Sequence, residues 1–249
     1  MIVLLCATVL YSCEKNAVQD ITGDPPAAVI KFFNFGVNAP AVNFYAGETK
    51  MTAINSATGT ESVLGVGYGS VGAGGFYLGI APGQYAFKGK IAALVDKDLA
   101  ISNVAGTIEA RKFYSMYLSG IYNTTDKTVE GFIIEDVFAT VDTGKAQVRF
   151  VNAISNSSPM TLYAKNTTTM EEFAVGGAVA YKTGGAFTAL PNGVYDLSTR
   201  YAGATTNAIT RTAVSFSKGR IYTIGSRGDI TVVGTTAVNR PFLDNTLNR

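Results

Sequence analysis

Short stretches of this chain alternate apolar and polar positions with the period of a β-strand. In 29–34, and again in 147–152, successive side chains fall on opposite faces of an extended backbone. Runs rich in Val, Ile, Phe, Tyr and Thr are interrupted by Gly, Asn or Pro roughly every ten residues, as in 82–83 and 191–193. Beyond Cys13 no segment carries a long apolar stripe at helical spacing. The pattern predicts an all-β chain built from antiparallel sheets.

The chain also repeats itself in order. Segment 28–34 (AVIKFFN) aligns with 146–152 (AQVRFVN), and two later pairs of segments also match: 80–85 with 189–195, and 112–116 with 220–224. Because the order of the matches is preserved, the sequence predicts one β-sandwich domain used twice. We expect the two copies in 28–143 and 144–238, followed by a C-terminal tail in 239–249.

The segments that open the two copies, FFNFGVNAPAVNFYA in the first and VRFVNA with LYA in the second, resemble the domain-of-unknown-function family 4397 (DUF4397). The resemblance covers nearly all of 28–235. It implies immunoglobulin-like sandwiches, which in this family occur in exported and surface lipoproteins, often in tandem. The family carries no established activity, so the resemblance supplies no catalytic residues.

The first residues have the pattern of an export signal. Residues 2–10 (IVLLCATVL) form a charge-free apolar run that is too short to cross a bilayer as a helix, and Leu10-Tyr11-Ser12-Cys13 resembles a bacterial lipobox. We expect a lipoprotein signal peptide in 1–12, lipidation of Cys13, and a polar tether in 13–27. Acylation would hold the protein on membrane lipid in the cell envelope, at the outer membrane of a Gram-negative bacterium. The alternative is an N-terminal strand with a buried cysteine.

Composition argues against several functions. The 20 basic and 18 acidic residues give a net charge of +2, and no run of Lys or Arg suggests nucleic-acid binding. The chain contains no His, the commonest general base and metal ligand. Both cysteines, Cys6 and Cys13, lie at the N-terminus, so the rest of the chain has no thiolate for a disulfide or a metal. We expect no catalytic residue, no metal and no cofactor.

Several motifs look chemical but lack the context that their chemistry needs. Segment 67–72 (GYGSVG) matches the dinucleotide-binding fingerprint, but three residues unsuited to open a helix follow it, so its glycines are expected in turns or bulges. Segments 215–218 (SFSK) and 182–184 (KTG) fit motifs of penicillin-interacting enzymes in the reverse order. The carboxylates of 96–98 and of Glu135-Asp136 are expected on a solvated edge or loop.

Four tyrosines near predicted loops, Tyr68, Tyr77, Tyr181 and Tyr201, are candidate ligand contacts, although strand packing is the favoured explanation for them. The sequence thus predicts an envelope lipoprotein that acts as a non-catalytic binding, adhesion or spacer module. Its expected partners are membrane lipid through Cys13 and a surface glycan or another envelope protein. The alternatives are a glycan-acting hydrolase that uses paired carboxylates, and a fimbria or surface-layer subunit joined through an exposed edge strand.

Overall fold

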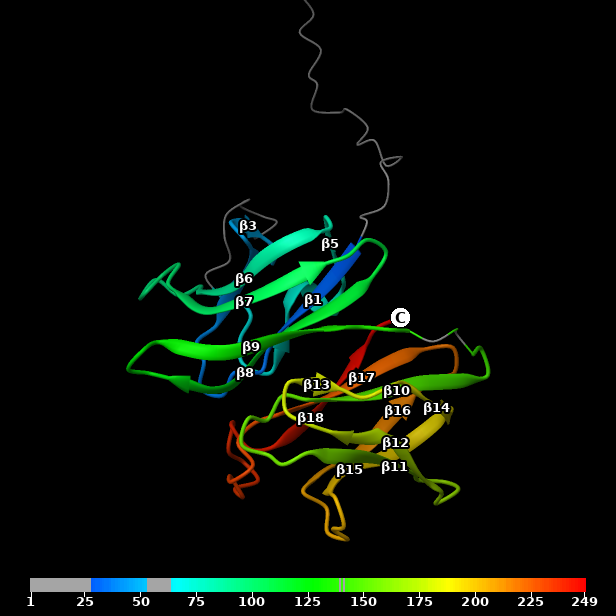
Figure 1. The fold of residues 1–249 in the computed structure, drawn as a ribbon. Helices are drawn as coiled ribbons and strands as arrows, with labels where there is room; N and C mark the ends of the chain where they lie inside the picture. The colour runs from blue at the N-terminus through cyan, green and yellow to red at the C-terminus, as the bar shows by residue number, and fades with distance from the viewer. Residues whose placement is uncertain (1–27, 53–63, 139, 141) are drawn as a thin grey trace, which may run out of the picture.

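The computed structural model describes residues 28–52, 64–138, 140 and 142–249. These residues form two β-sandwiches stacked one on the other (Figure 1). No helix in the described part of the chain is long and apolar enough to cross a membrane. Cys6, Cys13 and the expected signal peptide and tether lie outside the described residues.

The first domain contains two sheets. One has the strand order β4-β1-β8-β9, with β5 also paired to β1, and the other has the order β3-β2-β6-β7. The short 3-10 helix η2 (Gly72–Gly75) connects β4 to β5. The strands are β1 (Ala28–Asn34), β2 (Val42–Ala46), β3 (Thr49–Lys50), β4 (Ser70–Val71), β5 (Leu78–Ile80), β6 (Gly83–Ile91), β7 (Ala100–Ile108), β8 (Phe113–Asn123) and β9 (Thr128–Glu135).

The second domain repeats this topology strand for strand. Its sheets have the orders β13-β10-β17-β18, with β14 also paired to β10, and β12-β11-β15-β16. The strands are β10 (Lys145–Asn152), β11 (Met160–Asn166), β12 (Glu172–Val179), β13 (Thr183–Gly184), β14 (Thr188–Pro191), β15 (Gly193–Tyr201), β16 (Ile209–Phe216), β17 (Ile221–Arg227) and β18 (Phe242–Leu247).

The strand register is repeated as well as the order. Val29 lies opposite Phe113 in the first domain, and Gln147 lies opposite Ile221 in the second, which are the positions that the sequence repeat aligns. The prediction of tandem sandwiches is confirmed. One detail differs, because β1–β8 and β10–β17 are parallel pairs within otherwise antiparallel sheets. Several strands separate the members of each pair along the chain, which leaves enough length for the crossover that a parallel pair requires.

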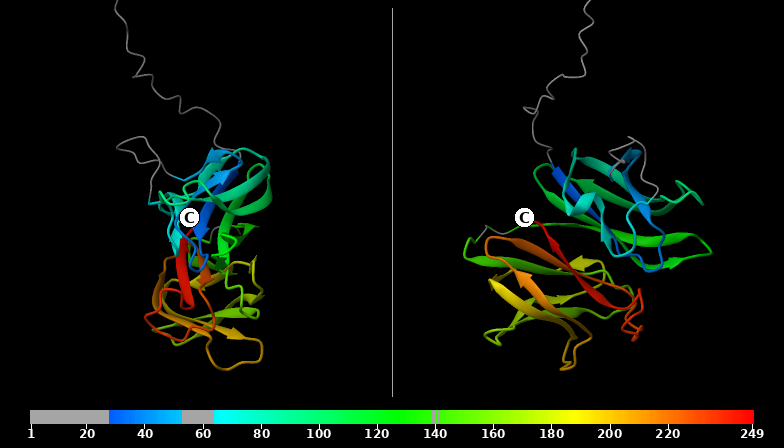
Figure 2. Two further views of the ribbon diagram at one scale, coloured as in Figure 1. Left: turned by 90° about the vertical axis from the view of Figure 1, so that its left-hand side faces the viewer. Right: turned by 180° about the vertical axis from the view of Figure 1, so that it is seen from behind.

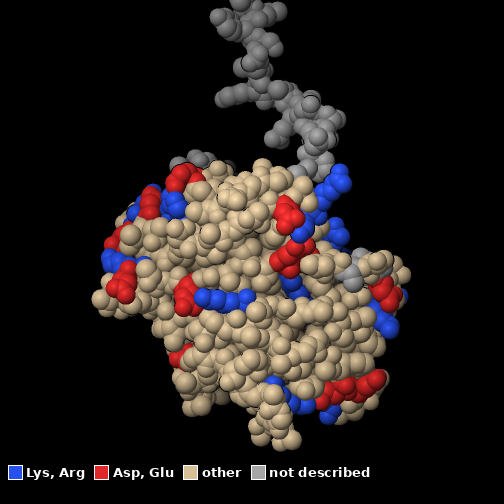
Figure 3. All heavy atoms as spheres, in the orientation of Figure 1, with Lys and Arg blue, Asp and Glu red and all other residues tan. Residues whose placement is uncertain are grey.

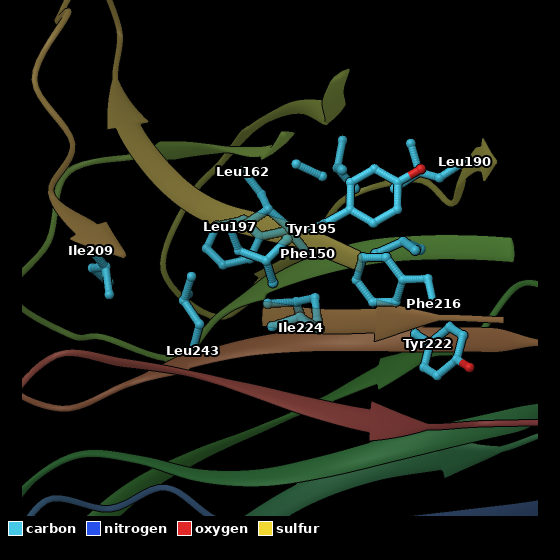
Figure 4. Packing of buried hydrophobic residues seen from close by; sticks show 14 of the residues in the cluster. Phe150, Leu162, Leu190, Tyr195, Leu197, Ile209, Phe216, Tyr222, Ile224 and Leu243 are labelled. Carbon is cyan, nitrogen blue, oxygen red and sulfur yellow. The ribbon is translucent and has the colours of Figure 1, made fainter. Parts of the chain in front are cut away.

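Each sandwich has its own apolar core, formed by the inward-facing residues of its two sheets. In the first domain Phe32 of β1 stacks on Phe44 of β2, with ring centroids 5.0 Å apart. In the second, Phe150, the equivalent of Phe32, lies among Leu162, Leu197 and Ile224 between the sheets (Figure 4). Strands β1 and β10, which open the two domains, are rich in apolar residues because each supplies side chains to its domain's core.

The segment 239–249, which we expected to be a tail, contains strand β18. This strand pairs with β17 from Arg227↔Phe242 to Tyr222↔Leu247 and completes its sheet. The end of the chain consequently lies between the two sandwiches (Figure 2). The segment follows a loop with several polar residues, so its sequence alone did not distinguish an edge strand from a tail.

Candidate functional site at the interface of the two domains

Strands β1 and β10 are buried on both faces. Ile30 of β1 points into the core of the first domain, whereas Lys31 and Phe33 point away from it and are each only 1% exposed. Arg149 and Val151 of β10 are buried in the same way on the outer face of the second domain. These outer faces are covered because the sheet that holds β1 packs against the sheet that holds β10 (Figure 2). We call this contact the seam.

The apolar centre of the seam combines large side chains from the first domain with small residues from the second. Tyr117 of β8 lies between Phe33 and Phe132, with centroids 4.3 and 5.0 Å away and the rings nearly parallel. Phe35 points at Gly225 of β17, where a Cβ atom would stand 2.8 Å from the Phe35 ring. The other small residues in this cluster are Val151 and Ala153. Size complementarity of this kind gives close packing between rigid sheets.

A buried ion pair joins the domains beside this apolar centre. The Arg149 guanidinium donates to the carboxylate of Asp136, and the two residues are 3% and 2% exposed. Asp136 also accepts hydrogen bonds from the hydroxyls of Ser115 (2.8 Å) and Tyr77 (2.5 Å), while Arg149 Nε donates to Thr223 Oγ1 (3.0 Å). The expectation of a solvated Asp136 was wrong. The carboxylate follows the last residue of β9, where the second domain covers it and supplies its counter-ion.

A second buried cation, Lys31, lies near this pair. Its ammonium donates to the carbonyl of Leu247 (2.6 Å) and sits 4.4 Å from the centre of the Tyr77 ring. Burial lowers the pKa of Lys31 to about 8; the charge of Asp136 opposes this shift and that of Arg149 adds to it. The ammonium is therefore desolvated at neutral pH, without a carboxylate of its own.

The contacts across the seam are reciprocal. Lys31 and Arg149 occupy equivalent positions in the repeat, and each reaches into the other domain: Lys31 to the Leu247 carbonyl and Arg149 Nη1 to the Glu135 carbonyl (3.3 Å). Those two acceptors are also equivalent, because Glu135 pairs with Tyr114 where Leu247 pairs with Tyr222. The seam thus has the isologous geometry of a two-fold interface, with approximate symmetry.

At one end of the seam the segment resembling a dinucleotide fingerprint contacts the second domain. The Arg227 guanidinium lies 4.8 Å from the Tyr68 ring centre and hydrogen-bonds to Asp244 (2.5 Å). Gly69 has φ +76°, and a Cβ there would stand 2.8 Å from Arg227 Cζ. Gly69 therefore provides a turn and a close approach for arginine, two tasks for which glycine is suited.

At the other end Tyr181 of the second domain reaches the first. Its hydroxyl donates to Glu130 (2.7 Å) and lies 3.0 Å from the Ser119 hydroxyl. Burial raises the Tyr181 pKa, and Glu130 adds to the shift. Tyr68 and Tyr181 are equivalent residues, since each precedes by two positions the strand that pairs with β1 or β10. Tyr77 also lies in the seam, whereas Tyr201 packs at the edge of the second core. Three of the four tyrosines singled out in the sequence thus lie in the seam, at separate places along it.

Two grooves flank the seam at equivalent places. One, of about 580 Å³, is lined by residues of both domains that include Lys31, Phe76, Tyr77, Arg220 and Asn248. The other, of about 430 Å³, is lined by residues that include Arg149, Glu135, Phe138 and Phe187. Elsewhere, on the face seen in Figure 3, charged side chains of both signs are scattered in small groups over an otherwise uncharged surface.

Grouped acidic side chains can hold a metal ion. No three Asp, Glu or Cys side chains of the described chain are grouped in this way. The carboxylates of Glu109 and Glu135 share one ammonium, that of Lys112, at 3.1 and 3.0 Å on the surface. Their hydrogen bonds raise the pKa of Lys112 to about 12. The arrangement is an exposed ion-pair network of the sort that surface strands commonly carry.

Sequence reasoning did not single out Lys31 or Arg149, and it placed Asp136 on a solvated edge or loop. One signal was available, because 30–35 contains apolar residues on both faces of the strand. A strand that covers a single core needs only one such face. The double apolar pattern therefore pointed to a second buried surface.

Fold and seam together define a two-domain β-sandwich protein whose equivalent sheets pack face to face. The family model for a domain of unknown function, DUF4397, matches residues 28–163 and 146–241. The chain belongs to the DUF4397 family. The first match runs on through β10 into β11, so the two matches overlap at the start of the second domain. A search of curated proteins found no match to the chain.

Proposed function

We propose that this chain is a non-catalytic binding module of the cell envelope, held on membrane lipid through Cys13, whose two sandwiches act as one rigid body. The buried ion pair across the seam is the observation that carries the rigid-body part of the proposal. The lipobox-like segment and the polar residues after it support the anchor.

Rigidity follows from what separation would expose. Opening the seam would hydrate the Phe33–Tyr117–Phe132 stack and would remove Arg149 from its buried partner, Asp136. Hydrating this buried aromatic surface is unfavourable, whereas loosely joined domains share smaller and more polar interfaces. A rigid pair of sandwiches holds the outer loops of the two domains at fixed distances from one another, and such loops are the usual place for recognition.

The open edge of β18 favours a module that does not polymerise. The Asn248 N–H pairs with Ile221 of β17, so the alternate residues Leu243 and Leu247 direct their backbone groups away from that strand. Both of their carbonyls accept side-chain donors, from Arg211 Nη1 (2.6 Å) and from Lys31 Nζ (2.6 Å). Basic side chains at a sheet edge hinder the addition of a further strand. This edge is thus a poor joint for a fimbria subunit.

Spin-label distances test the rigid body. Labels at two exposed positions, Leu94→Cys and Val233→Cys, report across the domains in a chain whose native cysteines are replaced by serine. We expect one narrow distance distribution, as narrow as that of the control pair Met170→Cys and Val233→Cys within the second domain. A broad distribution between domains beside a narrow one within the domain would refute the rigid arrangement.

Metabolic labelling with a fatty-acid analogue tests the anchor. We expect the wild-type protein and the Cys6→Ala control to take up the label, and Cys13→Ala to lose it. Only Cys13 follows the lipobox-like segment, so it alone should become acylated. Label retained in Cys13→Ala, or absent from the wild type, would disprove this part of the proposal.

A further inference from the structure

The described part of the seam buries two cations but one carboxylate. Lys31, Arg149 and Asp136 are its buried charged residues. Asp136 follows Glu135, and the equivalent residue after Leu247 is Asn248, a neutral amide. Both positions hydrogen-bond to a hydroxyl of the neighbouring strand. The Ser115 hydroxyl donates to Asp136, and the equivalent Thr223 hydroxyl accepts from the Asn248 amide (2.7 Å). Arg149 thus has a carboxylate beside it, and at the equivalent place Lys31 has an amide.

The groove beside Lys31, which we call the Lys31 groove, is positively charged. Arg220 and Arg249 line it together with Lys31, and no acidic side chain is among its lining residues in the described chain. Arg249 lies over the Phe113 ring, 4.7 Å from its centre, which holds its guanidinium in place. Cations that converge on a concave, partly desolvated surface concentrate anions there.

The same groove offers groups suited to a hydroxylated ligand. The side-chain oxygen of Asn248, a residue only 8% exposed, is buried but accepts no hydrogen bond. Buried acceptors are normally paired, so this oxygen is available to a ligand hydroxyl. Phe76 is 74% exposed and lies next to Tyr77 in the groove wall, where it provides an apolar face for a sugar ring. The volume of about 580 Å³ is in the usual range for small-ligand sites.

We propose that the Lys31 groove binds a saccharide that carries a carboxylate. The ligand carboxylate supplies beside Lys31 and Arg220 the negative charge that Asp136 supplies beside Arg149. A ring hydroxyl donates to Asn248. Because residues of both domains line the groove, the ligand binds across the seam. This inference rests on the proposed role as a binding module and specifies the class of its ligand.

Calorimetric titration of the full-length chain at an ionic strength of about 0.15 M, where charges more than about 8 Å apart are largely screened, tests the proposal with three probes: glucuronate, glucose and acetate. We expect glucuronate to bind at least ~10-fold more tightly than either of the others, because only glucuronate provides both the charge and the hydroxyls. Arg220→Glu should weaken glucuronate binding by about 10- to 100-fold. The matched control is Lys218→Glu, which makes the same charge change in the same turn outside the groove; it should leave the affinity within about 2-fold.

Asn248→Ala separates the hydroxyl contact from the charge contacts. It should weaken glucuronate binding and leave acetate binding unchanged. The proposal is overturned if glucuronate does not bind, if glucose or acetate binds as tightly, or if Lys218→Glu acts as strongly as Arg220→Glu. If such a result came with narrow spin-label distances and acylated Cys13, the proposed ligand class would be refuted. The proposed role as a rigid, membrane-anchored module would still hold. Glucuronate binding with broad distances would instead refute only the rigid body.

Discussion

Replacing Asp136 by Asn should destabilise the protein far more than an exposed ion pair of the same chemistry would suggest. The substitution keeps the size of the side chain and removes the negative charge beside Arg149, which is 3% exposed. The guanidinium would retain Thr223 Oγ1 and the Glu135 carbonyl as acceptors but would have no adjacent counter-ion. A buried charge left in this state costs about 3–5 kcal/mol.

The matched control is Glu172→Gln, which breaks the pair between Glu172 and Arg200 (2.7 Å) on the surface of the second domain. Exposed pairs contribute about 0–1 kcal/mol, so the two substitutions should differ several-fold in their effect on the free energy of unfolding. The double variant Asp136→Asn/Arg149→Met should recover roughly 1–3 kcal/mol relative to the sum of the single variants, because it also removes the unpaired cation.

Urea unfolding followed by tyrosine fluorescence measures these differences, since the chain has no Trp and carries Tyr117 and Tyr77 in the seam. With a slope of about 3 kcal/mol/M, the midpoint of Asp136→Asn should fall by about 1–2 M. If the domains uncouple, the single transition should also split in two. If the midpoint falls no further than that of Glu172→Gln, or if the double variant shows no recovery, Asp136 and Arg149 do not form a buried ion pair that the seam depends on.

The remaining predictions concern other residues of the seam. The folded chain should release the Lys31 proton near pH 8 and the unfolded chain only near pH 10.5, so the stability of the wild type relative to Lys31→Met should rise between these values, by at most about 3 kcal/mol. Gly69→Ala should lower stability, because alanine is strained at φ +76° and would displace Arg227. Gly225→Val should cost about 1–3 kcal/mol through overlap with Phe35. Urea unfolding measures all three.

Matched controls exist for these changes. Gly47 has φ +61° but no neighbour near an added Cβ, so Gly47→Ala isolates backbone strain and should cost less than Gly69→Ala. Gly177 has open space around an added Cβ, so Gly177→Val should be milder than Gly225→Val. Equal effects within either pair would contradict the close approaches. A stability difference between wild type and Lys31→Met that falls or stays flat above pH 8 would contradict the burial of the ammonium.

Much of the fold could be predicted because its signals are local. Alternation in 29–34 identified a strand, and the ordered matches to the second half identified a repeated domain whose register the structure reproduces. The glycines of 67–72 were expected in turns, and Gly69 occupies one. The C-terminal strand β18 was missed because its pairing with β17 is a long-range choice made by the folded sheet.

The seam could not be predicted because it depends on which faces of two finished domains meet. Asp136 and Arg149 are close along the chain, yet nothing in their sequence context shows that both become buried. The equivalence of Tyr68 and Tyr181 was also hidden, because the spacing between equivalent positions shrinks along the chain from β1–β10 to β8–β17. Lipidation of Cys13, the envelope location and the absence of catalysis stay predictions.

Reciprocal contacts like those of the seam are the contacts that a homodimer makes with itself. A single-sandwich ancestor that paired through this face would have carried each interface residue twice, so every substitution would have acted in both halves at once. In a chain that carries both copies, the two halves can change independently. A glycine could then arise opposite a phenylalanine, and an acid and an amide could occupy positions that were once identical. The asymmetry within this pair of domains is available only to a fused chain.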